Sequence, residues 1–310
     1  MADKSTPRIV FLGTPEFAVA SLAALQEAGF TIAGVVTAPD KPAGRGMQLQ
    51  QSAVKKFALA NKIPVLQPEK LRDPQFLEQL RELKADLQVV VAFRMLPEVV
   101  WNMPPMGSVN LHGSLLPQYR GAAPINWAII NGEELTGVTT FKLQHEIDTG
   151  NILLQESFAI GEEETAGEVH DRMMLIGAGL LVKTVQGLSD GTLSESPQVI
   201  TGQLLKHAPK IHTDTCRINW SQPCATIHNL IRGLSPYPGA FTILNEKMLK
   251  IFKSSKEITF PGSTEGSYET DGKTFLKIAC LDGYIHLLEV QMEGKKRMHI
   301  RDFLRGYHFS

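Results

Sequence analysis

Three polar side chains in the middle of the chain could together carry out acyl transfer. Asn110 and His112 lie two residues apart, and Asp148 opens an Asp-Thr-Gly motif further along. An amide N–H can hold a carbonyl oxygen as it becomes an oxyanion, an imidazole can move a proton near neutral pH, and a carboxylate can orient that imidazole. We therefore take these three residues as the candidate catalytic group, with transfer of an acyl or formyl group as the chemistry.

The segment around His112 strengthens this interpretation. Residues 108–111 are expected to form a strand that delivers His112 at its carboxyl end, where open α/β sheets place ligands. Side chains two residues apart on a strand share one face, and two polar groups at the end of a buried strand are costly unless they are paired or used. A single histidine is more often the polar tip of a packed ring, so the pattern matters more than the residue type.

Apolar strands alternate with helices over the first 190 residues. Strands are expected at 8–13, 31–37, 64–66, 87–93, 108–111, 137–143 and 152–160, and helices at 52–61, 73–83, 123–131 and 165–187. Nearly continuous apolar strands indicate a buried parallel sheet. We predict the α/β class, with a Rossmann-like, mostly parallel sheet and helices on both faces. The Pro/Gly-rich stretch 38–46 is expected to be an exposed loop with no strand.

The texture of the sequence changes after residue 192. Segments 240–244, 248–254, 275–280 and 284–291 are short and partly alternating, and Gly, Asp and Ser separate them. This pattern predicts a small β-barrel or sandwich. A chain of 310 residues is long enough for two domains. We expect a catalytic domain at 1–190, a linker at 191–207 and a second domain at 208–310.

Composition excludes several classes of protein. A net charge of -1 gives no global footprint for nucleic acid, so such a partner would need a local basic patch. The three cysteines form no C-x-x-C pair and are expected to be reduced and buried; His145-Glu146 lacks the second His of H-E-x-x-H, so no metal is expected. Gly13 is not part of a G-x-G-x-x-G motif. With no signal peptide or bilayer-spanning run, we expect a cytoplasmic enzyme.

Six motifs together closely resemble the methionyl-tRNA formyltransferases, over nearly the whole chain. They are GTPEF at 13–17, KPAGRG at 41–46, NLHGSLLPQYRGAAP at 110–124, GE at 132–133, TGVT at 136–139 and DTG at 148–150. The core formed by Asn110, His112 with the following SLLP run, and Asp148 is similar to that of folate-dependent formyltransferases generally. This core therefore identifies the reaction, but it says little about which acceptor receives the formyl group.

The resemblance implies transfer of a formyl group from 10-formyltetrahydrofolate to the α-amine of methionyl initiator tRNA. In this scheme Asn110 donates to the oxyanion, His112 shuttles the proton, and Asp148 fixes the His tautomer and supports proton transfer to the folate nitrogen. Free α-amino groups titrate at about 7.7–8.0, so the amine can attack in its neutral form. The resemblance also implies an OB-like carboxy-terminal barrel, and we expect a monomer.

Two further sets of residues follow from the resemblance. Folate is expected against Phe93, Arg94 and Leu96 and against the turn Ser114, Leu115, Leu116 and Pro117. The Phe93-Arg94-Met95 run departs from the Gly-containing stretch of many family members, and Arg94 could equally be a solvated side chain. Contacts to tRNA are expected from Lys41, Arg45, Lys295, Lys296 and Arg297, although such side chains are also common on solvated surfaces.

Two alternatives remain open. A folate-dependent formyltransferase that acts on an amino sugar nucleotide would share the folate core, but it should lack the Arg45 loop and the GTPEF opening. A folate- or RNA-binding module without activity would be expected to lack Asn110, His112 or Asp148, and all three are present.

Overall fold

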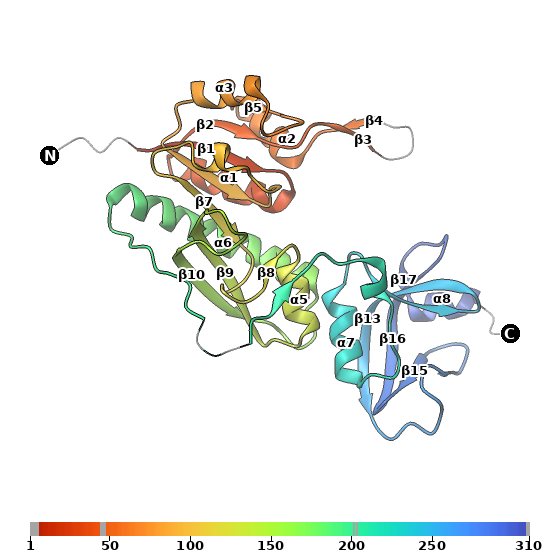
Figure 1. Cartoon of the computed structure of the whole chain (residues 1–310). Coiled ribbons are helices and arrows are strands. Elements are labelled where there is room, and N and C mark those ends of the chain that lie inside the picture. Colours follow the sequence, from red (N-terminus) through yellow and green to blue (C-terminus); the bar gives the residue numbers. More distant parts are fainter. Residues whose placement is uncertain (1–5, 44–47, 201, 203, 308–310) are drawn as a thin grey trace. The chain divides into compact units, whose positions relative to one another are not determined.

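The strands predicted before residue 190 and those predicted after residue 192 form two separate sheets (Figure 1). The structure, a computed structural model, describes residues 6–43, 48–200, 202 and 204–307. By its internal contacts the chain divides into two units, each described here by itself. The first unit comprises 1–120, 137–158 and 170–206, and the second comprises 121–136, 159–169 and 207–310. The predicted boundaries at 190 and 208 stay a prediction.

A seven-stranded sheet forms the centre of the first unit. Its strand order is β10-β9-β7-β6-β1-β2-β5. The strands are β1 (Arg8–Gly13), β2 (Thr31–Val36), β5 (Val65–Leu66), β6 (Leu87–Val91), β7 (Ser108–His112), β9 (Leu135–Lys142) and β10 (Ile152–Ala159). Strands β5, β2, β1, β6 and β7 pair in parallel, whereas β9 is antiparallel to β7. Every residue of β6 is buried, as expected for a parallel strand covered on both faces. The predicted mostly parallel, Rossmann-like sheet is confirmed.

Helices connect the parallel strands of this sheet. They are α1 (Glu16–Glu27), α2 (Ala53–Ala60), α3 (Pro74–Glu82) and α4 (Glu98–Trp101), and a fifth helix, α6 (Ala166–Asp190), follows β10. The side chains of Ser52 and Asp73 cap α2 and α3 by accepting hydrogen bonds from backbone N–H groups three residues later. Helix α3 buries Phe76, Leu77 and Leu80 in a core shared with Val10, Leu12 and Val90 of the sheet. No helix in the described part of the chain is both long and apolar enough to cross a bilayer.

One expectation about this unit is wrong. The stretch 38–46 was expected to contain no strand, but β3 (Lys41–Ala43) pairs with β4 (Gln48–Gln50) in a two-stranded antiparallel ribbon. Pro42 pairs with Leu49 within it. In a two-stranded ribbon each strand has an unpaired edge, so a residue without an N–H is tolerated there, although it would break a central strand.

The second unit is built on a curled antiparallel sheet. Its strands are β12 (Ala240–Leu244), β13 (Lys247–Ile258), β16 (Gly283–Met292), β15 (Leu276–Cys280) and β14 (Tyr268–Thr270) in spatial order, with β17 (Met298–His299) beside β16. The remaining elements are β8 (Arg120–Gly121), α5 (Pro124–Ile130), β11 (His207–Ala208), η1 (Thr213–Cys216), α7 (Cys224–Gly233) and α8 (Ile300–Gly306). Ile227 and Ile231 of α7 are buried in one core with Leu249 and Ile251 of β13. The predicted barrel-like carboxy-terminal domain is confirmed as a half-barrel.

Candidate active site

The carboxyl ends of β6 and β7 position the candidate catalytic residues. Val90 pairs with Asn110 across these parallel strands, and on the other side of β7 His112 pairs with Thr139 of β9. Asn110 and His112 therefore share one face, as their spacing predicts. Strand β6 ends just beyond Val91, because Ala92 adopts a left-handed conformation with φ 47°.

His112 is held from both sides of its ring. Its Nε2–H donates to the backbone carbonyl of Tyr119 at 2.9 Å, and the Phe141 ring meets it edge-on at 6.5 Å between centroids. With the proton on Nε2, the neutral ring presents the lone pair of Nδ1. Nδ1 lies 3.8 Å from Oδ2 of Asp148, and only 7% of the His112 side chain is exposed. The Tyr119 carbonyl, and not Asp148 as the resemblance implies, thus sets the tautomer, and Nδ1 is the atom that can accept a proton.

The backbone of Asp148 is constrained by its neighbours. Asp148 has φ 54°, and its carboxylate is 13% exposed. A β-carbon on Gly150 would lie 1.7 Å from the carbonyl oxygen of Lys142, so no side chain fits at position 150. Gln198 donates from Nε2 to the carbonyls of both Asp148 and Gly150, at 2.9 Å each. These contacts fix the loop that carries the carboxylate.

The Asn110 side chain differs from its neighbours because it is not satisfied by the protein. It is half-buried, and no other residue in the described ranges hydrogen-bonds its carboxamide. A carboxamide carries two donors and one acceptor, and polar groups away from water are normally paired. Asn110 therefore offers a donor to a ligand on the same face as His112.

The turn after His112 is fastened to β9 by Thr139. The Thr139 hydroxyl is buried, donates to the Ser114 carbonyl at 2.7 Å, and accepts from the Leu116 N–H at 3.1 Å and from Gln155 Nε2 at 2.9 Å. Tyr119 ends the turn at φ 59°. The sequence analysis assigned no role to Thr139, although the TGVT motif at 136–139 was a usable signal.

The predicted folate residues of this turn lie partly inside the protein. Ser114 is buried and donates from Oγ to the Gln118 carbonyl at 2.6 Å. Leu116 is also buried, whereas Leu115 and Pro117 are half-buried. These side chains shape the turn, and their contact with folate stays a prediction.

The predicted folate residues after β6 lie at the same end of the sheet. Phe93 and Leu96 are half-buried against the core of β1, β2 and β6. Arg94 is exposed, donates to the Glu69 carbonyl at 2.9 Å and to the Pro68 carbonyl, and lies over the Phe93 ring. Its guanidinium fastens this end of the sheet to the segment after β5, so Arg94 already has a structural role.

Comparison with known proteins decides the family. The Formyl transferase family matches residues 7–185, and the family's C-terminal domain matches residues 210–308. The methionyl-tRNA formyltransferase of Parabacteroides distasonis is 53% identical over 98% of this chain and 97% of its own length. That of Bacteroides fragilis is 50% identical over 99% and 97%. This chain belongs to the methionyl-tRNA formyltransferase family. The predicted family and the prediction of an enzyme are confirmed.

Solved structures extend the likeness of the fold. An N-formyltransferase from Helicobacter canadensis, solved with folinic acid and dTDP-3-aminofucose, superposes with a TM-score of 0.69 at 24% identity, over 94% of this chain and all of that one. At this identity the likeness shows a shared fold alone. The specific likeness is to the methionyl-tRNA formyltransferases, at about twice the sequence identity.

For a member of the methionyl-tRNA formyltransferase family, the basic residues expected to contact tRNA matter next. Lys41 is exposed on β3 of the first unit, while Arg45 lies outside the described residues. Lys295, Lys296 and Arg297 are exposed between β16 and β17 of the second unit. Arg297 bonds Glu289 and lies over the Phe252 ring. Their contact with tRNA stays a prediction.

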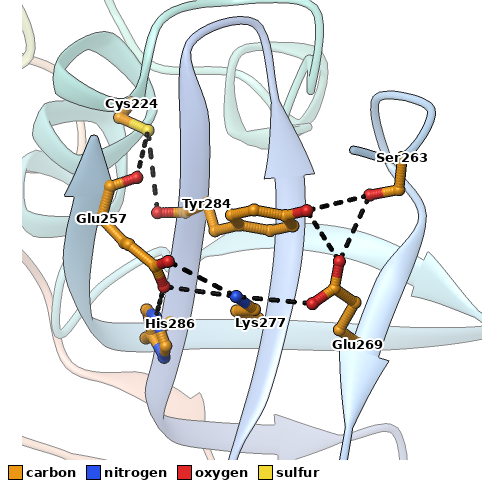
Figure 2. A network of polar contacts seen from close by, with 7 residues as sticks. All are labelled: Cys224, Glu257, Ser263, Glu269, Lys277, Tyr284 and His286. Atoms are coloured by element: carbon orange, nitrogen blue, oxygen red, sulfur yellow. Dashed lines mark hydrogen bonds and ion pairs between the residues drawn. The ribbon is translucent and has the colours of Figure 1, made fainter. Parts of the chain in front are cut away.

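A second polar cluster, which we call the Lys277 cluster, lies on the curled sheet and is fully paired (Figure 2). Lys277 lies 3.3 Å from Glu257 and 3.4 Å from Glu269, with its ammonium 3.9 Å from the Tyr284 ring centroid. Burial opposes its charge, but the two carboxylates outweigh burial and raise the pKa of Lys277. Hydrogen bonds from His286 and Tyr284 lower the pKa of Glu257 and of Glu269, respectively.

Beside this cluster, Cys224, Cys280 and Asp282 are near enough to one another to suggest a metal site. The two sulfurs lie 2.9 Å apart, and the Asp282 carboxylate accepts the Cys224 N–H at 2.7 Å. Burial raises the pKa of the Cys224 thiol far above its usual range, so that thiol stays protonated at neutral pH. All three cysteines of the chain are free and buried, as the sequence predicts.

Proposed function

We propose that this chain transfers the formyl group of 10-formyltetrahydrofolate to the α-amino group of methionine on initiator tRNA. The observation that carries the proposal is the meeting of an unpaired amide, Asn110, with a His112–Asp148 pair at the carboxyl end of the sheet. Identity of about 50% to methionyl-tRNA formyltransferases over nearly the full chain supports the choice of acceptor.

Asn110 stabilises the negative charge of the reaction. The donor supplies the formyl carbon that the amine attacks. As the formyl oxygen gains charge, the Asn110 carboxamide donates to it, at no cost in broken protein hydrogen bonds because no described residue uses that group. Preorganised donors of this kind act strongly because they need no rearrangement at the moment of reaction.

His112 moves the proton. The α-amine attacks in its neutral form and must then lose a proton. Nδ1 of His112 accepts it, since Nε2 already carries a proton held by the Tyr119 carbonyl. The Asp148 carboxylate, 3.8 Å from Nδ1, stabilises the imidazolium until the proton passes to the departing nitrogen of the donor. No covalent enzyme intermediate is needed.

The remaining assignments complete the proposal. Folate binds against residues 93–96 and 114–117, and the basic residues at 41, 45 and 295–297 contact tRNA. The chain acts as a monomer in the cytoplasm, with the folate chemistry in residues 1–190 and the tRNA-binding barrel in 208–310.

Formylation of methionyl initiator tRNA by the purified protein, with 10-formyltetrahydrofolate as donor, tests the proposal. We expect wild-type protein and a His145→Ala control to form formylmethionyl-tRNA, because His145 is an exposed histidine with no described contact. His112→Ala should lose most of the activity. An amino sugar nucleotide serves as the competing acceptor, and turnover of that substrate alone would overturn the tRNA assignment. Absence of turnover with both acceptors would favour a binding module.

A further inference from the structure

Gln198 lies in the segment expected to be a linker, yet its side chain is turned toward the active site. It is half-buried, whereas its neighbours Pro197 and Val199 are exposed. Its Nε2 donates to the carbonyls of Asp148 and Gly150, and its Oε1 accepts from Nε and Nη2 of Arg120 at 3.2 and 2.6 Å. Every hydrogen-bonding position that one carboxamide normally uses is filled.

Arg120 connects this carboxamide to the other half of the site. It directly follows Tyr119, whose carbonyl accepts the His112 Nε2–H. One side chain, Gln198, thereby joins the turn that sets the His112 tautomer to the loop that carries Asp148. The two loops are far apart in sequence, and this bridge is independent of the sheet that also supports them.

The backbone around Gln198 is docked in the same way. Ser196 and Ile152 exchange two backbone hydrogen bonds, at 2.8 and 2.9 Å. Further along the segment, Lys206 accepts the Tyr119 N–H at 2.7 Å and donates its own N–H to the Gln118 side chain at 2.8 Å. The segment is therefore fastened to the Asp148 loop near one end and to the His112 turn near the other.

We infer that Gln198, together with Arg120, is a positioning residue for formyl transfer, acting through Asp148. This inference rests on the proposed function. A non-glycine residue at positive φ is held there against its preference, and Asp148 has φ 54°. Without the two bonds from Gln198, the loop can relax and the carboxylate can leave Nδ1 of His112.

The principal test is steady-state kinetics of Gln198→Ala and Gln198→Glu. Gln198→Glu keeps the length and the partner for Arg120, but it sets carboxylate oxygens against the Asp148 and Gly150 carbonyls. Since misplacement of a catalytic group by about 1 Å can cost about 10²-fold in rate, we expect kcat to fall by about that factor in both variants, with KM for both substrates unchanged. The control is Glu195→Ala, which removes the hydrogen bond from Asn151 and a charge that acts on Lys142. It leaves both bonds from Gln198 to the Asp148 loop in place and should keep wild-type kcat.

A double-mutant cycle separates positioning from a general structural role. In an Asp148→Ala background, Gln198→Ala should cause no further loss of kcat, because the group through which Gln198 acts is gone. A wild-type kcat in both single variants, or an equal further loss in the Asp148→Ala background, would overturn the inference while leaving the proposed function intact.

Hydrogen exchange provides a readout that does not depend on turnover. The Ile152 amide donates to Ser196, and amides at 148–154 should exchange faster in Gln198→Ala than in wild type or Glu195→Ala. If wild-type protein formylates neither acceptor, the proposed function fails. Unchanged exchange in Gln198→Ala would show, independently of activity, that Gln198 does not order this loop. Faster exchange would keep Gln198 as the residue that orders this loop.

Discussion

The His112 site of the first unit and the Lys277 cluster of the second contain similar groups, but they differ in how completely those groups are paired. Each combines a basic side chain with a carboxylate and a neighbouring backbone or aromatic group. In the Lys277 cluster the ammonium lies 3.3 and 3.4 Å from two carboxylates, and both carboxylates accept further hydrogen bonds. At the His112 site the closest approach of ring and carboxylate is 3.8 Å, and Asn110 has no described partner.

The difference suggests that fully paired polar groups stabilise the fold, whereas unpaired polar groups are available to a substrate. A fully paired cluster has little left to offer a ligand, so it contributes to the stability of the curled sheet. A cluster with an unused donor, and with a histidine nitrogen that can still accept a proton, can instead bind a substrate and take up its proton. Four predictions test whether this division holds.

The largest effect is expected at Asn110. Replacing it with Ala removes the donor to the oxyanion, which typically costs about 10²–10³-fold in kcat. The free energy of unfolding should not fall, because no described side chain or backbone group loses a partner. Formylation kinetics and urea unfolding measure both quantities, with exposed Asn102→Ala as the control. A destabilised Asn110→Ala protein with normal kcat would show that Asn110 stabilises the fold and does not act in catalysis.

Thr139 should contribute both to stability and to catalysis, because it supports the active-site turn from within the core. Thr139→Val keeps the shape but removes bonds to Ser114, Leu116 and Gln155. We expect unfolding to become easier by about 1–3 kcal/mol, with a fall in kcat smaller than that of Asn110→Ala. Thr140→Val is the matched control, since Thr140 bonds Thr184 on the other face of β9. Equal kcat in the two valine variants would show that the bonds from Thr139 to the turn are not needed for catalysis.

Lys277→Met should affect stability alone. The substitution keeps the length of the side chain but leaves two carboxylates facing each other, so the free energy of unfolding should fall by about 1 kcal/mol. Formylation kcat should stay at the wild-type value. Lys273→Met, at an exposed position of the same unit, is the control for loss of one charge. A loss of kcat in Lys277→Met alone would show that the cluster is more than a stabilising element.

The smallest effect is the dependence of stability on acid. The pKa of Glu257 and of Glu269 is lowered from 4.5 in the folded protein, so the unfolded chain binds protons first as the pH falls. The stability that these groups contribute is present above pH 4.5 and is lost below it, as the pH passes through their folded pKa values. Urea unfolding across this range should give a shallower pH dependence for Glu269→Gln than for wild type. An identical slope would show that the network does not hold the carboxylate charge in solution.

Much of the fold and the site could be predicted because the signals are local. Residues 87–93 are apolar except for Gln88, and such nearly continuous runs indicate buried parallel strands. Asn110 and His112 could be placed on one face from spacing alone, since strand side chains alternate. The distance between Asp148 and His112 could not be predicted, because spacing along the chain does not place a loop 36 residues beyond His112.

Other features could not be predicted, for different physical reasons. The contact of Gln198 with Asp148 spans 50 residues and comes from an irregular segment without periodicity. The β3–β4 ribbon depends on an edge position that makes Pro42 acceptable, which no local rule reveals. Helix α7 did have a signal, apolar residues at 227, 230, 231 and 234, but it is a short helix beside segments with a β pattern.

The second unit is built from segments that lie far apart in the sequence, and this affects how it folds during synthesis. Asn126 of α5 donates to the Gly233 carbonyl at the end of α7, a contact across 107 residues. At a synthesis rate of about 5–20 residues per second, α5 leaves the ribosome roughly 5–20 s before its partner helix exists. During that interval the face of α5 that packs against α7 has no partner, so the second unit cannot complete its core until α7 has been made.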